Sequence, residues 1–432
     1  MSDRYKDDVE LLNDPQETVR IAALERLSDD RDVTATPFTE EVNNHVHTRY
    51  SFSPYSPAAV AYYARRAGLR VVGSVDHESI AGAGEMKRAA AIAGIGSTVG
   101  CEIRVDFAGT PFEERRLNNP DTIGNGYIVI HGVPERSWEP LAAHLRPLNA
   151  ARERRNRKQL EGLNTLIAGE LGTLEYDRDV RALSWAHNGG SVTERHILFA
   201  LARRVIDAVP DPGKTAIFLT ERFGIEVPVS AQQRINDPTN PHRAYDLLGV
   251  FKAEFVPQFF VQPDREECPP VTEITALARE LGAIPAYSYL GDVGESPTGD
   301  KKAQQFEDEY VDELFASLRD LGFLAVTYMP PRNTKEQLLR IQELARRYEL
   351  LEISGVDINS SRQSFHCPEV LQPEFRHLGE TTWALVGHEA AAKDDRDRGF
   401  FGPSGGTGSL TERIARFAEL GKRSTPAGAD LL

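Results

Sequence analysis

The fold is decided by residues 41–105, which read EVNNHVHTRYSFSPYSPAAVAYYARRAGLRVVGSVDHESIAGAGEMKRAAAIAGIGSTVGCEIRV. The runs VNNHVH, LRVVGSVDH and IGSTVGCEIRV predict strands, because each is short and bordered by polar residues or glycine. The alanine-rich segments between them end at glycine, which predicts helices. Strands that alternate with helices indicate a parallel sheet, either doubly wound or closed into a barrel.

The same alternation returns later in the chain. A fourth strand is predicted at 126–133 (GYIVIHGV), and three more follow at 283–290, 323–329 and 350–359. From roughly 140 to 260 helical periodicity replaces the strand pattern, which predicts a mostly helical insertion. A barrel interrupted by this insertion explains the pattern better than two independent domains.

The chain is therefore expected to divide into five segments. These are an N-terminal helical extension (1–35), a first barrel part (36–139), the helical insertion (140–265), a second barrel part (266–392) and a C-terminal Gly-rich segment with one helix (393–432).

The amino-acid composition argues against nucleic acids and membranes as binding partners. The 432 residues include 65 acidic and 50 basic side chains, a formal net charge of −15, which repels nucleic acid backbones and anionic membranes. The three cysteines are scattered, the N-terminus is charged, and no run approaches about 18 apolar residues. We expect a cytoplasmic protein that acts on a small molecule, without long nucleic acid or membrane, and the oligomeric state stays open.

Metal-binding side chains gather where the predicted strands end. His45 and His47 close the first strand, and alternate strand residues face the same side, so both imidazoles can bind one ion. The carboxyl ends of the strands form the active face of parallel barrels. The candidates at these ends are His45, His47, His77, Glu102, His131 and Asp357. Imidazole mixed with carboxylate suits Zn²⁺, Mn²⁺ or Fe²⁺.

The ordered series HVHTRYS, VDH, GCE, IHG and a late GVD resembles the PHP superfamily, named for its polymerase-associated and histidinol phosphatase members. The resemblance implies a distorted seven-stranded β/α barrel with up to three metal ions. It assigns His45, His47, Glu102 and Asp357 to the first metal site, and Glu102 and His131 to the second. In a third site it implies His77.

Three positions depart from the family pattern. Tyr287 stands where the second site has a histidine, and Phe52 and Asn359 stand in the third site. Asn359 can ligate through its carbonyl oxygen, whereas the Tyr287 hydroxyl can orient water or a phosphate oxygen. Asp292 and His388 are candidates to replace missing ligands. We expect one to two ions per chain and no conventional third.

The insertion resembles one found in a phosphoesterase branch of the same family, where an Arg-rich helix precedes a segment like (S/T)RxHxxxxL. The resemblance implies that Arg152, Arg155 and His196 bind a substrate phosphate. The alternative for the two arginines is a solvated helix with Glu153 and Glu161 as partners.

The main hypothesis is a metal-dependent phosphoesterase that hydrolyses a nucleotide or sugar phosphate with metal-activated water. In this hypothesis His77, His131 and Tyr287 are the catalytic candidates. One alternative is a single-metal hydrolase or isomerase acting on a carbonyl or sugar substrate. The other is a metal-binding regulatory protein that has lost its catalysis.

Overall fold

The computed structural model describes residues 3–29, 36–119, 121–293 and 305–432, and its sheet is the seven-stranded barrel that the sequence predicts. The strands lie in chain order: β1 (Val42–Val46), β2 (Val71–His77), β3 (Gly96–Asp106), β4 (Asn125–His131), β5 (Ile284–Tyr289), β6 (Ala325–Tyr328) and β7 (Leu351–Ser354). A bridge between Val46 and Ile358, just beyond β7, brings the two edges together. The sheet is therefore a nearly closed barrel.

The parallel pairing that the strand–helix alternation predicts holds for every neighbouring pair except those of β4. This strand runs antiparallel to both β3 and β5, whereas every other pair is parallel. Parallel neighbours need a crossover, usually a helix, and the described part of the β3–β4 connection, residues 107–119 and 121–124, contains none. The polar loop between these strands was the signal for this reversal.

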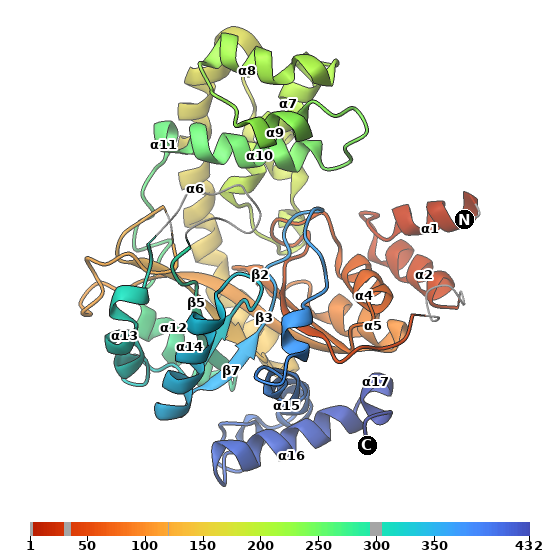
Figure 1. The fold of residues 1–432 in the computed structure, drawn as a ribbon, viewed down its shortest axis with the longest axis vertical. Helices are drawn as coiled ribbons and strands as arrows, with labels where there is room; N and C mark the ends of the chain where they lie inside the picture. Colours follow the sequence, from red (N-terminus) through yellow and green to blue (C-terminus); the bar gives the residue numbers. More distant parts are fainter. Residues whose placement is uncertain (1–2, 30–35, 120, 294–304) are drawn as a thin grey trace.

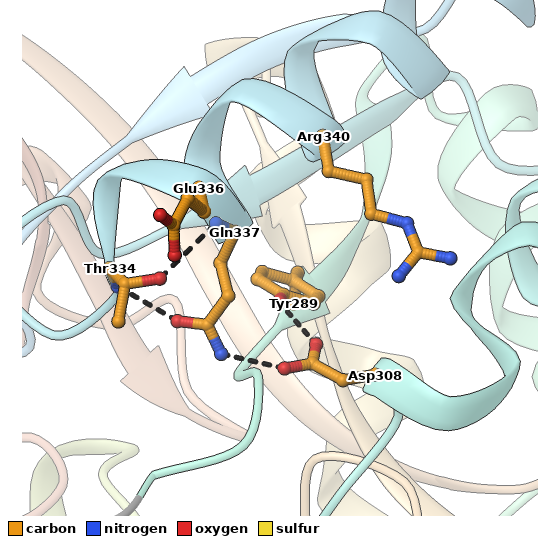
Figure 2. A pocket seen from close by; sticks show the side chains of 6 residues that line it. All are labelled: Tyr289, Asp308, Thr334, Glu336, Gln337 and Arg340. Carbon is orange, nitrogen blue, oxygen red and sulfur yellow. Dashed lines mark hydrogen bonds between the residues drawn. The ribbon is translucent and has the colours of Figure 1, made fainter.

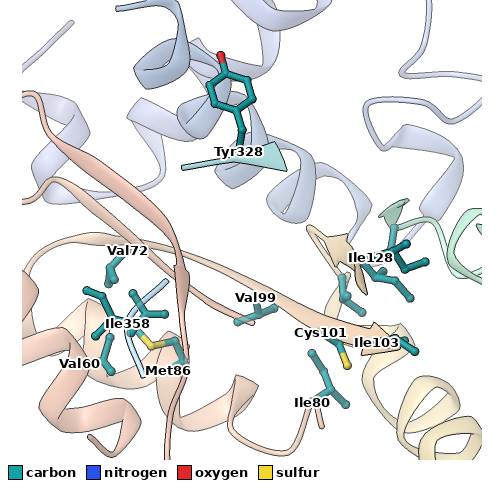
Figure 3. Packing of buried hydrophobic residues seen from close by; sticks show 14 of the residues in the cluster. Val60, Val72, Ile80, Met86, Val99, Cys101, Ile103, Ile128, Tyr328 and Ile358 are labelled. Atoms are coloured by element: carbon teal, nitrogen blue, oxygen red, sulfur yellow. The ribbon is translucent and has the colours of Figure 1, made fainter. Parts of the chain in front are cut away.

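Helices cover the outside of the barrel. They are α4 (Pro57–Arg66), α5 (Ala83–Ala93), α12 (Val271–Glu280), α13 (Val311–Leu318) and α14 (Lys335–Arg347), while α1 (Asp3–Leu11) and α2 (Glu17–Ser28) lie beside α4 and α5 (Figure 1). Val60, Val72, Met86 and Ile358 form part of the apolar layer between strands and helices (Figure 3). This layer fixes which strand residues are left to face inward.

One end of the barrel is closed by the C-terminal helices α15 (His377–Ala392), α16 (Leu410–Arg423) and α17 (Pro426–Ala429), which lie beneath the sheet in Figure 1. The inward side chains Val42 and Ile284 share an apolar cluster with Trp383 of α15. Buried Asn44 donates to Ser354 O (3.0 Å) and Thr382 Oγ1 (2.7 Å), so polar bonds also tie this end together. The candidate metal-binding residues therefore lie at the opposite end of the barrel.

The insertion stands above the barrel. Helix α6 (Trp138–Leu171) rises from it, and α7 (Glu194–Ala208), α8 (Thr215–Phe223), α9 (Val229–Ile235), α10 (Arg243–Glu254) and α11 (Val256–Phe259) gather around its far half (Figure 1). These helices bury their own apolar cluster, which includes Leu163, Leu201 and Phe251. None of the described helices combines the length and apolarity needed to cross a membrane.

Short helical turns complete the described structure. They are Glu135–Ser137, Tyr176–Val180, Arg181–Leu183, Ala186–Asn188, Pro212–Lys214, Asp308–Tyr310, Pro368–Leu371 and Arg396–Arg398.

Candidate metal centre

An irregularity at the end of β1 places two histidines at the barrel mouth. The register between β1 and β2 shifts between Asn43 and Val46. The Asn43 side chain stabilises this shape, because its Oδ1 accepts from the backbone N–H groups of His45 and Val356, both at 2.9 Å. Gly355 packs so closely that a Cβ there would lie 2.6 Å from the Cβ of His45. The strand end and the segment after β7 are thus fitted to each other.

His45, His47 and Glu102 form a buried cluster. Each offers a ligand atom, and these atoms all lie within 4.8 Å of one another. Glu102 Oε2 lies 3.7 Å from His45 Nε2, 3.5 Å from His47 Nε2 and 3.2 Å from His77 Nδ1. Asp357 Oδ1 lies 3.3 Å from His47 Nε2. Side chains from β1, β2, β3 and the segment after β7 therefore meet at one point.

Backbone hydrogen bonds hold Asp357 against β1. His47 N donates to Ile358 O (2.9 Å), and Ile358 N donates to His45 O (3.1 Å). The Asp357 carboxylate also accepts from Asn359 Nδ2 at 2.7 Å. The strand predicted at 350–359 is interrupted, because β7 ends at Ser354 and only Ile358 bridges to β1. This break carries Asp357 over the barrel mouth.

Asn359 supports Asp357 and contacts the insertion. Its carbonyl oxygen, the atom expected to ligate an ion, accepts from Arg195 Nη1 at 3.1 Å. Its amide nitrogen donates to Asp357. In this structure both ends of the amide are engaged by protein groups, and its role as a ligand stays a prediction.

The carboxylates favour positive charge at the centre of the cluster. Burial raises the pKa of Asp357, but its hydrogen bond to His47 and the charges of His47, His45 and Arg195 outweigh burial and leave that pKa well below the ordinary value. Burial lowers the pKa of His47, but Asp357 and Glu102 outweigh it and leave the pKa raised. A divalent cation would satisfy the same negative potential.

His77 and His131 present neutral imidazoles. Burial, reinforced by the charges of His47 and Arg152, lowers the pKa of His77 well below its ordinary value. Burial together with His45 lowers the pKa of His131 to about 3. Metal ligation requires a neutral imidazole, so both side chains are in the required form at neutral pH.

Two histidine nitrogen atoms at the barrel mouth are among the buried polar atoms that lack a hydrogen-bond partner within the part of the chain that the structure describes. They are His77 Nδ1 and His131 Nε2. Buried polar atoms are nearly always satisfied, so an ion or water is expected beside them. Two or more imidazoles with two carboxylates fit Zn²⁺, Mn²⁺ or Fe²⁺, and the residues present therefore fit a metal centre.

Tyr287 lies away from this cluster. Ile284 and Ala286 belong to the apolar cluster with α15, whereas Tyr287 packs among the residues under the outer helices, with its ring 5.9 Å from that of Phe323. Its hydroxyl donates to Glu307 Oε1 at 3.4 Å. Because side chains alternate along a strand, Ser288 shares the inward face instead.

Two proposed substitutes for missing ligands are engaged elsewhere. Asp292 Oδ1 accepts from Phe306 N at 2.6 Å. His388 Nε2 lies 2.9 Å from Gly132 O, and its Nδ1 accepts from Phe400 N at 2.9 Å. Both residues thus contribute to local structure.

Arg152 and Arg155 lie in a buried ion-pair network. Arg152 binds Glu78, and its Nε donates to Glu267 Oε1 at 3.1 Å. Arg155 Nε donates to Glu267 Oε2 at 2.5 Å, and Arg104 Nη1 adds a third cation at 3.2 Å. The solvated-helix alternative is wrong, because the two α6 arginines are only 3% and 6% exposed. Whether they also contact a substrate stays a prediction.

His196 and Phe52 pack together at the base of the insertion. Thr193 N donates to His196 Nδ1 at 3.0 Å, so His196 takes part in the capping of α7. Its ring lies 5.0 Å from Phe52, edge to face, and burial lowers its pKa to about 4. Phe52 therefore supplies an apolar wall at the position where the family resemblance implies a ligand.

Several residues near the cluster escaped the sequence argument. Asp76, Thr48 and Ser51 form a hydrogen-bonded loop behind His47. The Tyr127 ring lies 5.5 Å from that of His77, and its hydroxyl accepts from Arg104 Nε at 3.2 Å. Thr48 and Ser51 follow HVH directly in the sequence, which was a usable signal, whereas nothing local marks Tyr127.

A hollow of about 290 Å³ lies on the outer side of the barrel. Its lining groups bond to one another: Tyr289 OH donates to Asp308 Oδ1 (2.5 Å), and Gln337 Nε2 donates to Asp308 Oδ2 (2.6 Å), as Figure 2 shows. It shares no residue with the metal cluster.

Comparisons with known proteins give likenesses of fold. No protein-family model and no curated protein matches the sequence. The structure is similar to that of a "putative metal-dependent phosphoesterase" from Bifidobacterium adolescentis, with a TM-score of 0.49 and 18% identity over 77% of this chain and 92% of that one. It is also similar to an amidohydrolase from Chromobacterium violaceum with bound sulfate and no metal, with a TM-score of 0.49 and 16% identity over 79% and 96%. The cluster residues, and not these likenesses, carry the functional assignment.

Proposed function

We propose that this protein is a metal-dependent phosphoesterase that hydrolyses a small phosphorylated molecule such as a nucleotide or sugar phosphate. One observation carries the proposal: the ligand atoms of His45, His47 and Glu102 lie within 4.8 Å of one another in a buried site. Asp357 adds a second carboxylate, 3.3 Å from His47. Two imidazoles and two carboxylates are the donor set of many hydrolytic metal sites.

These side chains would have different roles in the reaction. His45, His47, Glu102 and Asp357 would hold the ion, which supplies Lewis acidity and lowers the pKa of water towards about 7. The neutral His77 imidazole has the most exposed side chain of the three clustered histidines, at 17% against 9% and 1%. Its Nδ1 can accept a hydrogen bond from the attacking water and so orient it.

Arg195 is placed to bind a phosphate oxygen. It extends from α7 to Asn359 and its charge acts on both His77 and Asp357. Its guanidinium makes no carboxylate ion pair within the described ranges, whereas Arg104, Arg152 and Arg155 do. A guanidinium is suited to such recognition because its fork of N–H donors matches phosphate.

A second candidate function has one observation in its favour. Glu78 and Glu267 already bind the two arginines expected to bind phosphate. A single-metal hydrolase or isomerase acting on a carbonyl or sugar substrate does not need those arginines.

Metal analysis and a substrate panel test both candidates. Purified protein is assayed for bound Zn, Mn and Fe and for hydrolysis of aryl phosphate mono- and diesters with added Mn²⁺. We expect at least one ion per chain, activity lost with a chelator and restored by Mn²⁺, and a drop of about 100-fold or more in His45→Ala. The matched control is His187→Ala, because His187 is exposed and outside the cluster.

Two outcomes contradict the proposal differently. Activity that survives in His45→Ala removes the metal mechanism. Full metal loading without cleavage of any phosphate ester favours the carbonyl or sugar candidate, and inactivity on those substrates as well favours a regulatory metal-binding protein.

A further inference from the structure

The loop after β1 is tied to the carboxylate of Asp76. Asp76 Oδ1 accepts from Thr48 N (2.6 Å) and from Ser51 Oγ (2.7 Å), and its Oδ2 accepts from Thr48 Oγ1 (2.6 Å). All three residues are buried, with at most 4% of their surface exposed. Asp76 therefore determines where both hydroxyl protons point.

Only one of these hydroxyl groups touches the cluster. Ser51 Oγ lies 3.5 Å from His47 Nδ1, at the long end of hydrogen-bond distance. The opposite nitrogen of that ring, Nε2, lies 3.5 Å from Glu102 and 3.3 Å from Asp357. The His47 ring thus stands between Ser51 and the candidate metal position.

The Ser51 hydroxyl influences which ring nitrogen of His47 carries the proton. A hydroxyl has one proton, and Ser51 Oγ donates it to Asp76 Oδ1. Towards His47, the Ser51 oxygen therefore offers only lone pairs. With an ion at Nε2, this arrangement favours a proton on Nδ1 that His47 donates to Ser51 Oγ.

We infer that Ser51, oriented by Asp76, is a positioning residue that holds His47 in its metal-binding tautomer. The inference rests on the proposed function, since it needs an ion at Nε2. It adds a role for two residues that are not themselves ligands. Hydrogen bonds of this kind to a ligating imidazole typically change metal affinity by about 10- to 100-fold.

Ser51→Ala and Thr48→Val form a matched pair. Each removes one hydroxyl bonded to Asp76, but only Ser51 contacts His47. We expect Ser51→Ala to weaken Zn²⁺ and Co²⁺ affinity by about 10-fold or more in competition with a chelator, and Thr48→Val to change it by less than about threefold.

Proton NMR of the Co²⁺- or Zn²⁺-loaded protein supplies a second readout. The wild-type protein should show a slowly exchanging Nδ1–H of His47, which Ser51→Ala should lose and Thr48→Val should keep. The wild-type spectrum keeps the inference testable even if Ser51→Ala does not fold, because absence of that proton there overturns it.

The remaining outcomes separate this inference from the proposed function. Equal loss of affinity in both variants, or no loss in Ser51→Ala, overturns the role of Ser51 while leaving the metal site intact. A wild-type chain that binds neither ion overturns the proposed function and the inference with it.

Discussion

Replacing Arg152 with alanine should destabilise the protein strongly. Arg152 Nη2 donates to Glu78 Oε1 at 2.6 Å, and its Nη1 also pairs with this carboxylate. The Glu78 side chain is only 1% exposed, so the substitution would leave a buried carboxylate without its cation. Glu267 would still be bound by Arg104 and Arg155. The loss of stability should therefore come mainly from the unpaired carboxylate of Glu78.

The expected magnitude follows from this burial. Removing one partner of a buried ion pair costs about 3–5 kcal/mol. Arg154 provides the control on the same helix, because it pairs with Glu266 while the two side chains are 57% and 72% exposed. Exposed pairs contribute about 0–1 kcal/mol, so Arg152→Ala should lose roughly 3 kcal/mol more than Arg154→Ala.

Urea unfolding followed by circular dichroism measures the difference, and KM for an aryl phosphate is determined for both variants at saturating metal. An Arg152→Ala protein within about 1 kcal/mol of wild type, but with a raised KM, would refute the structural role and support the phosphate contact that the family resemblance implies.

Two further predictions concern stability. Burial raises the pKa of Glu307 to about 7, above its unfolded value near 4.5, so the folded protein retains this proton to higher pH and wild-type stability should fall by roughly 2 kcal/mol between about pH 5 and pH 7. Glu307→Gln should lack this component when unfolding is measured at pH 5 and pH 8, and an unchanged pH dependence would contradict the assignment. In α15, a Cβ at Gly387 would lie 1.9 Å from Phe417 O, so Gly387→Ala should cost about 1–3 kcal/mol by urea unfolding. Gly379→Ala in the same helix, whose Cβ would meet nothing nearer than 4.0 Å, should be neutral or stabilising, and equal effects would exclude close packing as the cause.

The sequence predicted the barrel and its candidate metal-binding rim because both depend on local patterns. Short strands that end in HVH, VDH and GCE can be recognised within a few residues, and the barrel brings those ends together. The direction of β4 was predictable in principle from the absence of a helical segment before it. Its reversal still leaves His131 close enough to His45 for their charges to interact.

Long-range packing explains what the sequence could not show. Tyr287 occupies the motif position of a histidine, but the inward face of β5 is set by contact with α15, about a hundred residues later. The partners of Arg152 lie 74 and 115 residues away, at Glu78 and Glu267. Neither relation leaves a periodic signal in the sequence. The arginines were therefore assigned to a substrate phosphate or to solvent, and not to the carboxylates of Glu78 and Glu267.

The departures from the family pattern leave the first site better supported than the others. A metal-bound imidazole at position 359 could not also donate to Asp357 and accept from Arg195, whereas the Asn359 amide does both. Phe52 packs against His196, which removes a ligand from the third site. Three residues of the first site are instead held by neighbours: His45 by Asn43, His47 by the Asp76 loop and Asp357 by Asn359. Because such bracing preorganises ligands and strengthens binding, this arrangement favours one tightly held ion over a cluster of three.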